Sequence, residues 1–147
     1  MKKLLVAAMC FAFAGVMQPQ NVWAQNQEAA KKSPNGPKFE FKGGDTYDFG
    51  KVPEGPSAEH IFEFKNTGKE PLIIQQANAS CGCTTPEWPK EPILPGKTGK
   101  ISVKFNTTGR GGQPFDKTVF ISSNAVTEKE RYELHIKGTV VKAEENK

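Results

Sequence analysis

A succession of short β-type runs between residues 39 and 141 constrains the fold of this chain most strongly. The clearest run extends from Ile101 to Phe105, where apolar and polar residues alternate with a period of two, and residues 132–137 repeat the pattern. Such alternation is typical of a strand with one buried and one solvent-exposed face. Gly, Pro or Asn bounds each run and favours a turn there. We predict seven strands, at residues 38–42, 46–52, 58–66, 72–77, 99–106, 116–122 and 131–141.

These runs predict an all-β fold. After residue 24, no segment keeps a helical apolar period for three turns. Seven strands in about a hundred residues are what an immunoglobulin-like β-sandwich requires, and a small closed barrel is the alternative. The Cys, Trp, Cys spacing of antibody domains is absent from the sequence. We therefore expect a seven-stranded immunoglobulin-like sandwich that apolar packing holds together.

The N-terminus has the features of a secretory signal peptide. Lys2 and Lys3 precede an unbroken run of apolar and small residues at positions 4–17. This run is shorter than the roughly 20 residues of a membrane-spanning helix. Small residues before position 25 predict cleavage between Ala24 and Gln25. The signal peptide would then cover residues 1–24, and the exported chain would lack a transmembrane segment.

Lipid attachment is not expected. Cys10 lies inside the apolar run, and the residue before it is Met9, where a lipidation site needs a small residue. Residues 25–38 are polar and rich in Pro, Gly and Ser, which predicts a disordered linker, and residues 142–147 form a short charged tail. The folded domain is expected to span residues 39–141.

The charge balance argues against a nucleic-acid partner. The chain has 20 Lys and Arg residues and 16 Asp and Glu residues, and Lys2 and Lys3 would leave with the signal peptide. The exported chain is therefore close to neutral and has no basic block that would release counterions from a nucleic acid. The loop at residues 109–112 has a single arginine, Arg110, and is interpreted as a flexible connector. A protein or cell-envelope partner is expected instead.

The sequence offers no evident catalytic set. His60 and His135 are the only histidines, and each lies within a predicted strand as an ordinary half-buried or surface residue. No serine sits on a nucleophile elbow. We therefore expect a protein that is not an enzyme and that needs no cofactor.

The segment 80–89 carries the candidate site. Cys81 and Cys83 are the only cysteines that would remain after removal of the signal peptide. In an extended strand their Cα atoms would lie about 7 Å apart, so a disulfide requires a bend, which Gly82 permits. A bond that closes so small a ring is a weak staple and comparatively easy to reduce. Three interpretations stay open: a local disulfide, a thiol that exchanges with a partner, and a soft-metal site for copper or zinc.

Trp88 lies in the same segment, between Pro86 and Pro89. On such a stiff loop the indole is either a lid over the core or an exposed contact residue. We keep Trp88 as a candidate contact residue.

Several short motifs occur one after another along the predicted domain. They are the run 62–68, then Pro71, Leu72, the run 81–84, Pro86, Trp88, Pro95, Gly96, Gly99, Val103, the run 105–107, Gly109, Ser123 and Asn124. Together they closely resemble the bacterial domain-of-unknown-function family 1573 (DUF1573). That family is similar to major sperm protein and to hydin-type (ASH) domains, which implies an immunoglobulin-like sandwich. It is typical of exported proteins and brings no assigned activity.

We therefore expect an exported, non-enzymatic binding or scaffolding module of the periplasm or cell surface. The edge strands of a sandwich offer sites for strand addition by a partner. The alternative function is a thiol redox or soft-metal-binding protein that uses Cys81 and Cys83.

Overall fold

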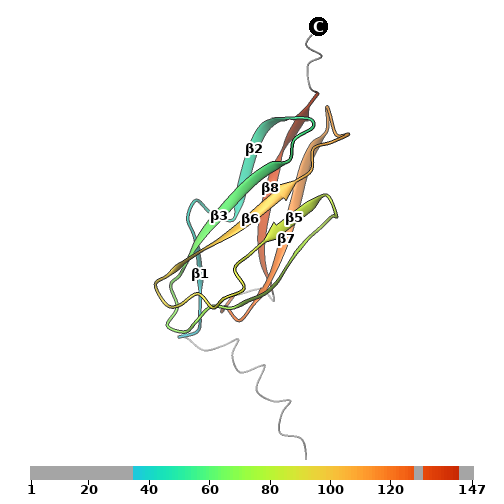
Figure 1. Ribbon diagram of the computed structural model, residues 1–147. Coiled ribbons are helices and arrows are strands. Elements are labelled where there is room, and N and C mark those ends of the chain that lie inside the picture. The colour runs from blue at the N-terminus through green and yellow to red at the C-terminus, as the bar shows by residue number, and fades with distance from the viewer. Residues whose placement is uncertain (1–34, 128–130, 143–147) are drawn as a thin grey trace, which may run out of the picture.

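The computed structural model describes residues 35–127 and 131–142, which form two packed four-stranded sheets (Figure 1). The first sheet has the order β1-β3-β6-β5, formed by β1 (Phe39–Phe41), β3 (Ala58–Asn66), β6 (Thr98–Phe105) and β5 (Thr84–Glu87). The second has the order β2-β8-β7-β4, formed by β2 (Thr46–Pro53), β8 (Tyr132–Val141), β7 (Pro114–Ser123) and β4 (Ile74–Ala79). The predicted all-β, immunoglobulin-like sandwich is confirmed.

The sandwich contains eight strands among the described residues, whereas the sequence predicts seven. The additional strand is β5, which covers only Thr84–Glu87 and pairs antiparallel with β6. It includes Pro86, which has no backbone N–H to donate and is therefore confined to edge strands. The seven predicted strands all occur, with ends displaced by at most two residues, and β3 has the predicted bounds.

One pair of strands is parallel. β2 runs parallel to β8, so that Thr46 lies opposite His135 and Val52 opposite Val140. All other paired strands are antiparallel. The β2–β8 register shifts between Asp48 and Lys51, where Gly50 has a φ of 63° and its N–H donates to the Asp48 carboxylate over 2.8 Å. Glycine adopts this left-handed conformation without the steric penalty of a side chain.

The alternating strands supply the core between the sheets. Ile101, Val103 and Phe105 on β6 are fully buried, as their period of two predicts. The ring of Phe105 stacks on that of Phe115 from the opposite sheet, with 4.2 Å between centroids. Because each sheet contributes one apolar face, the sandwich closes around a single core. The buried apolar residues are Phe62, Phe64, Leu72, Ile74, Ala77, Ile93, Ile101, Val103, Phe105, Phe115, Val119, Ile121, Ala125, Leu134, Ile136 and Val140.

Asn66 organises the loops at one end of the sandwich. Its side chain is fully buried at the end of β3. The amide nitrogen donates to the carbonyl oxygens of Glu70 (2.8 Å) and Ile93 (2.9 Å), and the amide oxygen accepts from the N–H groups of Gly68 (3.0 Å) and Lys38 (3.3 Å). One polar side chain therefore joins three separate loop segments.

The packed part of the chain begins inside the segment expected to be a linker. Gly36 and Pro37 are buried, and the carbonyl of Pro37 accepts a hydrogen bond from Val126 over 2.8 Å. The predicted signal peptide, the cleavage site between Ala24 and Gln25, and linker residues 25–34 lie outside the described residues, as do tail residues 143–147. Within the part that is described, no helix is long and apolar enough to cross a membrane.

Candidate functional site

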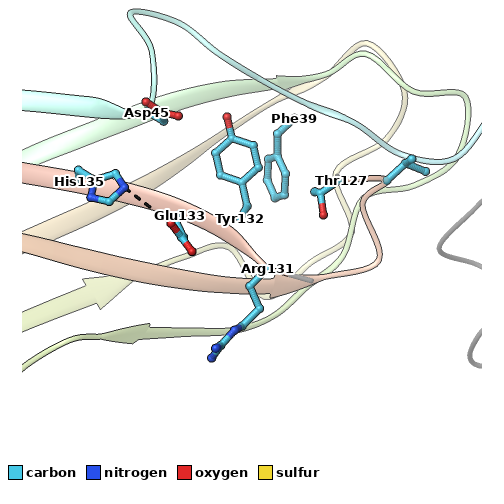
Figure 2. A pocket seen from close by; sticks show the side chains of 8 residues that line it. Phe39, Asp45, Thr127, Arg131, Tyr132, Glu133 and His135 are labelled. Carbon is cyan, nitrogen blue, oxygen red and sulfur yellow. Dashed lines mark ion pairs between the residues drawn. The ribbon is translucent and has the colours of Figure 1, made fainter. Parts of the chain in front are cut away.

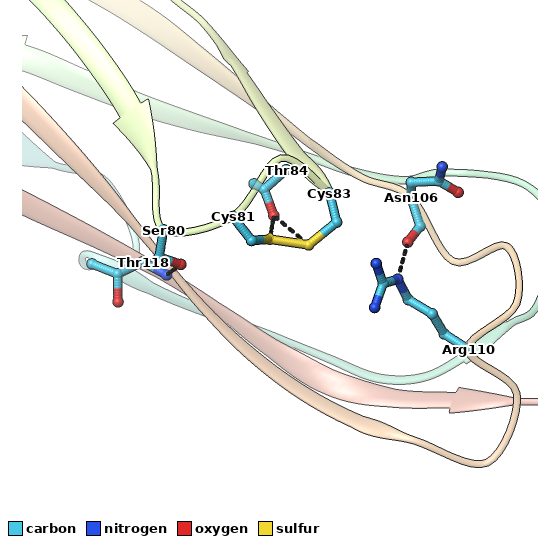
Figure 3. Close-up of a disulfide and its surroundings, with 7 residues drawn as sticks. All are labelled: Ser80, Cys81, Cys83, Thr84, Asn106, Arg110 and Thr118. Carbon is cyan, nitrogen blue, oxygen red and sulfur yellow. Dashed lines mark hydrogen bonds between the residues drawn. A yellow bond between two sulfur atoms is a disulfide. The ribbon is translucent and has the colours of Figure 1, made fainter.

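Cys81 and Cys83 lie in the turn that links β4, an edge of one sheet, to β5, an edge of the other (Figure 3). Their sulfur atoms are at disulfide distance, 1.96 Å, and their Cα atoms are 5.3 Å apart. The N–H of Thr84 donates to the carbonyl of Cys81 over 3.2 Å and closes the turn. The chain therefore bends at Gly82 as a bond between these cysteines requires.

On its buried side, the turn contacts both a polar side chain and the hydrophobic core. Thr84 is buried, and its hydroxyl oxygen lies 3.6 Å from the sulfur of Cys81 and 4.0 Å from that of Cys83 (Figure 3). The Cys83 side chain packs against the hydrophobic core. The Thr84 hydroxyl can therefore donate a hydrogen bond to either sulfur when that sulfur is a thiolate.

Backbone bonds anchor both ends of the turn. Before it, the N–H of Ser80 donates to the carbonyl of Thr118 on β7 over 2.8 Å. After it, the carbonyl of Cys83 accepts from the N–H of Asn106 over 2.9 Å, next to β6. The loop position is therefore fixed by both sheets and not by the disulfide alone.

Arg110 is a neighbour of the cysteine turn that the sequence analysis assigns only to a flexible connector. It lies in the connection from β6 to β7, and its Nε donates to the carbonyl of Asn106 over 3.0 Å. Figure 3 shows its guanidinium turned toward the disulfide, on the side of Cys83. The loop predicted as a flexible connector thus turns a permanent positive charge toward the side of the disulfide, and the guanidinium carbon also lies 5.7 Å from the centroid of the Phe105 ring.

Trp88 follows directly after β5 and is half-buried, with its ring packed against the core. The ammonium of Lys90 lies 3.0 Å from the ring centroid and covers part of the indole. The indole nitrogen is buried and has no hydrogen-bond partner within the described part of the chain. This placement is that of a lid over the core, and a role for Trp88 in partner contact stays a prediction.

The sequence model of a protein family of unknown function, DUF1573, matches residues 39–140. The chain belongs to this family. The match covers the sandwich and includes the cysteine turn. A comparison with curated proteins finds no significant match.

Solved structures share the fold of this DUF1573 domain. A protein of unknown function from Porphyromonas gingivalis is 15% identical, with a TM-score of 0.62, over 77% of this chain and 51% of that one. The chain thus spans about half the length of that protein. The ASH/PapD-like domain 7 of human CEP192 is 14% identical, with a TM-score of 0.56, over 92% of this chain and all of that domain. The secreted serine protease VesC from Vibrio cholerae is 12% identical, with a TM-score of 0.52, over 70% of this chain and 23% of the protease. At these identities the likeness shows the fold alone.

A cavity of about 260 Å³ lies elsewhere in the DUF1573 domain, near the start of β8 (Figure 2). The rings of Phe39 and Tyr132 line it with their centroids 5.3 Å apart. Burial, and to a lesser degree the carboxylate of Asp45, raises the pKa of Tyr132. His135 Nε2 lies 3.9 Å from the Glu133 carboxylate, and its Nδ1 lies 3.2 Å from the hydroxyl of Thr118.

The two histidines lie on different sheets. His60 is on β3, where its ring stacks on Tyr47 with 3.5 Å between centroids, and burial lowers its pKa. His135 is on β8. In the described ranges, 35–127 and 131–142, no group of three or more His, Cys, Asp or Glu residues is placed to hold a metal ion.

Proposed function

We propose that this protein is an exported, non-enzymatic binding or scaffolding module of the periplasm or cell surface, and that its partner is another protein. The observation that supports this proposal most directly is the open edge of β2. This strand is eight residues long and pairs with β8 on one side, and the structure describes no strand on its other side. An open edge presents backbone groups to which an extended segment of a partner can add as a further strand.

An aromatic side chain is exposed at this edge of the sandwich. Tyr47 on β2 is 37% exposed. The stacking of Tyr47 on His60 holds the tyrosine ring in place across the two sheets. Rigid aromatic side chains of this kind are favoured at protein interfaces because they bury a large area with little loss of conformational entropy.

The second half of β2 is protected against strand addition. The register shift between Asp48 and Lys51, together with Pro53 at the strand end, interrupts a regular edge. The part available for pairing is therefore the first three residues of the strand, Thr46 to Asp48.

Site-specific photo-crosslinking in the organism that makes the protein tests this proposal. A photoreactive residue at Thr46 is expected to give a defined covalent adduct with one protein. The matched control is Gln75, an exposed residue on β4, the opposite edge of the same sheet. Tyr47→Ser is expected to abolish the adduct at position 46 and to leave the domain folded. An equal pattern of adducts at positions 46 and 75 would contradict the proposal.

The cysteine turn favours a second candidate function, a thiol redox or soft-metal-binding role of Cys81 and Cys83. The supporting observation is that the two sulfurs lie together on an edge turn. A double variant, Cys81→Ser with Cys83→Ser, separates the two functions. Unchanged stability and unchanged adduct formation in this variant would remove the second candidate and leave the first.

A further inference from the structure

We propose that the Cys81–Cys83 disulfide is a thiol–disulfide exchange site for cysteine thiols of a partner protein, with Cys83 as the leaving thiolate and Arg110 and Thr84 as the residues that stabilise it. This inference rests on the second candidate function above and not on the open edge of β2. It assigns a direction to the exchange and a role to two residues outside the cysteine pair.

The positive charge of Arg110 favours a thiolate at Cys83, and it opposes the apolar core against which the Cys83 side chain packs, because apolar surroundings raise the pKa of a thiol. Arg110 donates to the carbonyl of Asn106, whose own N–H donates to the carbonyl of Cys83, so two consecutive hydrogen bonds of 3.0 and 2.9 Å connect the arginine to the cysteine. The guanidinium turns toward the disulfide from that side (Figure 3). A neighbouring arginine is one of the features that make a cysteine acidic and therefore a good leaving group.

Thr84 adds a hydrogen-bond donor on the buried side of the turn. Its hydroxyl oxygen is 3.6 Å from the Cys81 sulfur and 4.0 Å from the Cys83 sulfur. Because the hydroxyl hydrogen rotates freely, it can point at whichever sulfur becomes the thiolate. Thr84 is itself buried, so this donor is shielded from competition by water.

The solvent side of the turn is open to an attacking thiol. Gly82 is exposed, and a Cβ placed on it would meet no heavy atom within 4 Å apart from those of its two neighbours in the chain. Both cysteines are half-buried, and the Cys83 side chain packs against the core. Cys81 is half-buried and is not among the side chains packed against the core, so its sulfur is the one that a thiol on a partner surface reaches more easily.

Reduction leaves the frame of the turn in place. The bonds from Ser80 to Thr118 and from Asn106 to Cys83 involve the backbone and do not depend on the sulfur–sulfur bond. A disulfide between residues two apart also closes a very small ring and contributes little to stability. The bond can therefore open and close without unfolding the domain.

The exchange transfers two electrons from a partner dithiol to the cysteine pair. A partner thiolate attacks the Cys81 sulfur, the partner–Cys81 disulfide forms, and the Cys81–Cys83 bond breaks with its electron pair on the Cys83 thiolate. A second partner thiolate then attacks the partner sulfur of this mixed disulfide and releases the Cys81 thiolate. The partner dithiol is oxidised to a disulfide, the cysteine pair takes up the two electrons, and the two thiolates accept the two protons that the partner lost.

The first experiment measures the acidity of each cysteine in the full mature chain. Cys81→Ser leaves Cys83 alone and Cys83→Ser leaves Cys81 alone, and the alkylation rate with iodoacetamide as a function of pH gives the pKa of the remaining thiol. We expect the pKa of Cys83 to lie at least one unit below the usual value of about 8.5, and below that of Cys81. Arg110→Gln is expected to raise the pKa of Cys83 by about one unit, and Arg110→Lys to restore most of the difference.

The second experiment measures how fast the wild-type disulfide is reduced by 2-mercaptoethanol, an uncharged thiol, in the folded protein. The number of free thiols after acid quenching and alkylation is read by mass spectrometry. We expect Arg110→Gln and Thr84→Val each to slow reduction on the order of fivefold, because each makes Cys83 a poorer leaving group. The matched control is Arg131→Gln, since Arg131 lies over the ring of Phe120, away from the cysteine turn. A melting curve confirms that each variant is folded.

Two outcomes would overturn the inference. One is a pair of ordinary pKa values that do not respond to Arg110→Gln, and the other is a disulfide that thiols reduce only in denaturant. Either outcome would leave the crosslinking result at Thr46 unaffected. Loss of crosslinking with normal exchange kinetics would instead reject the binding edge and keep the exchange site.

Discussion

Replacing Asn66 with alanine should be among the most damaging polar substitutions in this domain. The side chain is fully buried and makes four hydrogen bonds to the backbone of three loop segments. A typical intramolecular hydrogen bond contributes about 1 kcal/mol net, and a buried carbonyl left without a donor loses a further 1 to 3 kcal/mol. Asn66→Ala removes all four bonds, although the Ile93 carbonyl keeps the N–H of Leu72 as a donor over 2.9 Å, and we expect it to lower the free energy of unfolding by about 3 to 4 kcal/mol.

Asn106 provides the matched control. Like Asn66 it lies at the end of a strand and precedes a threonine, but it is exposed, and its side-chain oxygen accepts one hydrogen bond, from the N–H of Thr108 over 2.9 Å. We expect Asn106→Ala to lower the free energy of unfolding by less than about 1 kcal/mol. Equilibrium unfolding in urea, followed by tryptophan fluorescence, measures both. Equal losses in the two variants would show that burial of the Asn66 network does not determine its contribution.

Three further predictions concern the core, the pH response and export. Phe105→Ala should lower the free energy of unfolding by about 3 to 5 kcal/mol in the same urea assay, because it empties a fully buried site against Phe115, and a loss below about 1 kcal/mol would contradict that packing. Burial lowers the pKa of His60 from 6.5, so the unfolded chain binds a proton at a higher pH than the folded chain. The free energy of unfolding should therefore fall as the pH drops below about 6.5 and through the pKa of the folded state. His60→Phe should flatten this part of the plot of stability against pH. N-terminal sequencing of the exported protein should begin at Gln25, and an intact Met1 would argue against cleavage.

The sequence predicts best those strands that have one buried and one solvent-exposed face. β3 and β6 alternate cleanly because one face packs in the core and the other meets water, so their bounds and buried residues follow from the residue order. β5 escapes prediction because it is short, carries Pro86 and is held in place by its pairing with β6. The parallel pairing of β2 with β8 has no local signal either, because nothing in one strand specifies the direction of a distant neighbour.

In the candidate site, too, the sequence predicts the local features but not the contacts made by tertiary structure. The cysteine spacing and the bend at Gly82 are local, and the structure places the two sulfurs together as that reasoning requires. Thr84 and Arg110 are brought to the pair by tertiary structure. Arg110 in particular comes from a glycine-rich connection for which the sequence predicts a plain loop, and the hydrogen bond to Asn106 and the contact with the Phe105 ring define its orientation.

The parallel pairing of β2 with β8 makes the order of chain synthesis important. Thr46 is near the beginning of the domain and His135 near its end, yet they are opposite one another in the sheet. A chain threaded across a membrane from its N-terminus would deliver β2 long before β8, and such long-range pairings form slowly. The second sheet therefore cannot close until nearly the entire domain is available. Truncation after β7 should consequently release β2 as an unpaired strand, so β8 decides when the second sheet is complete.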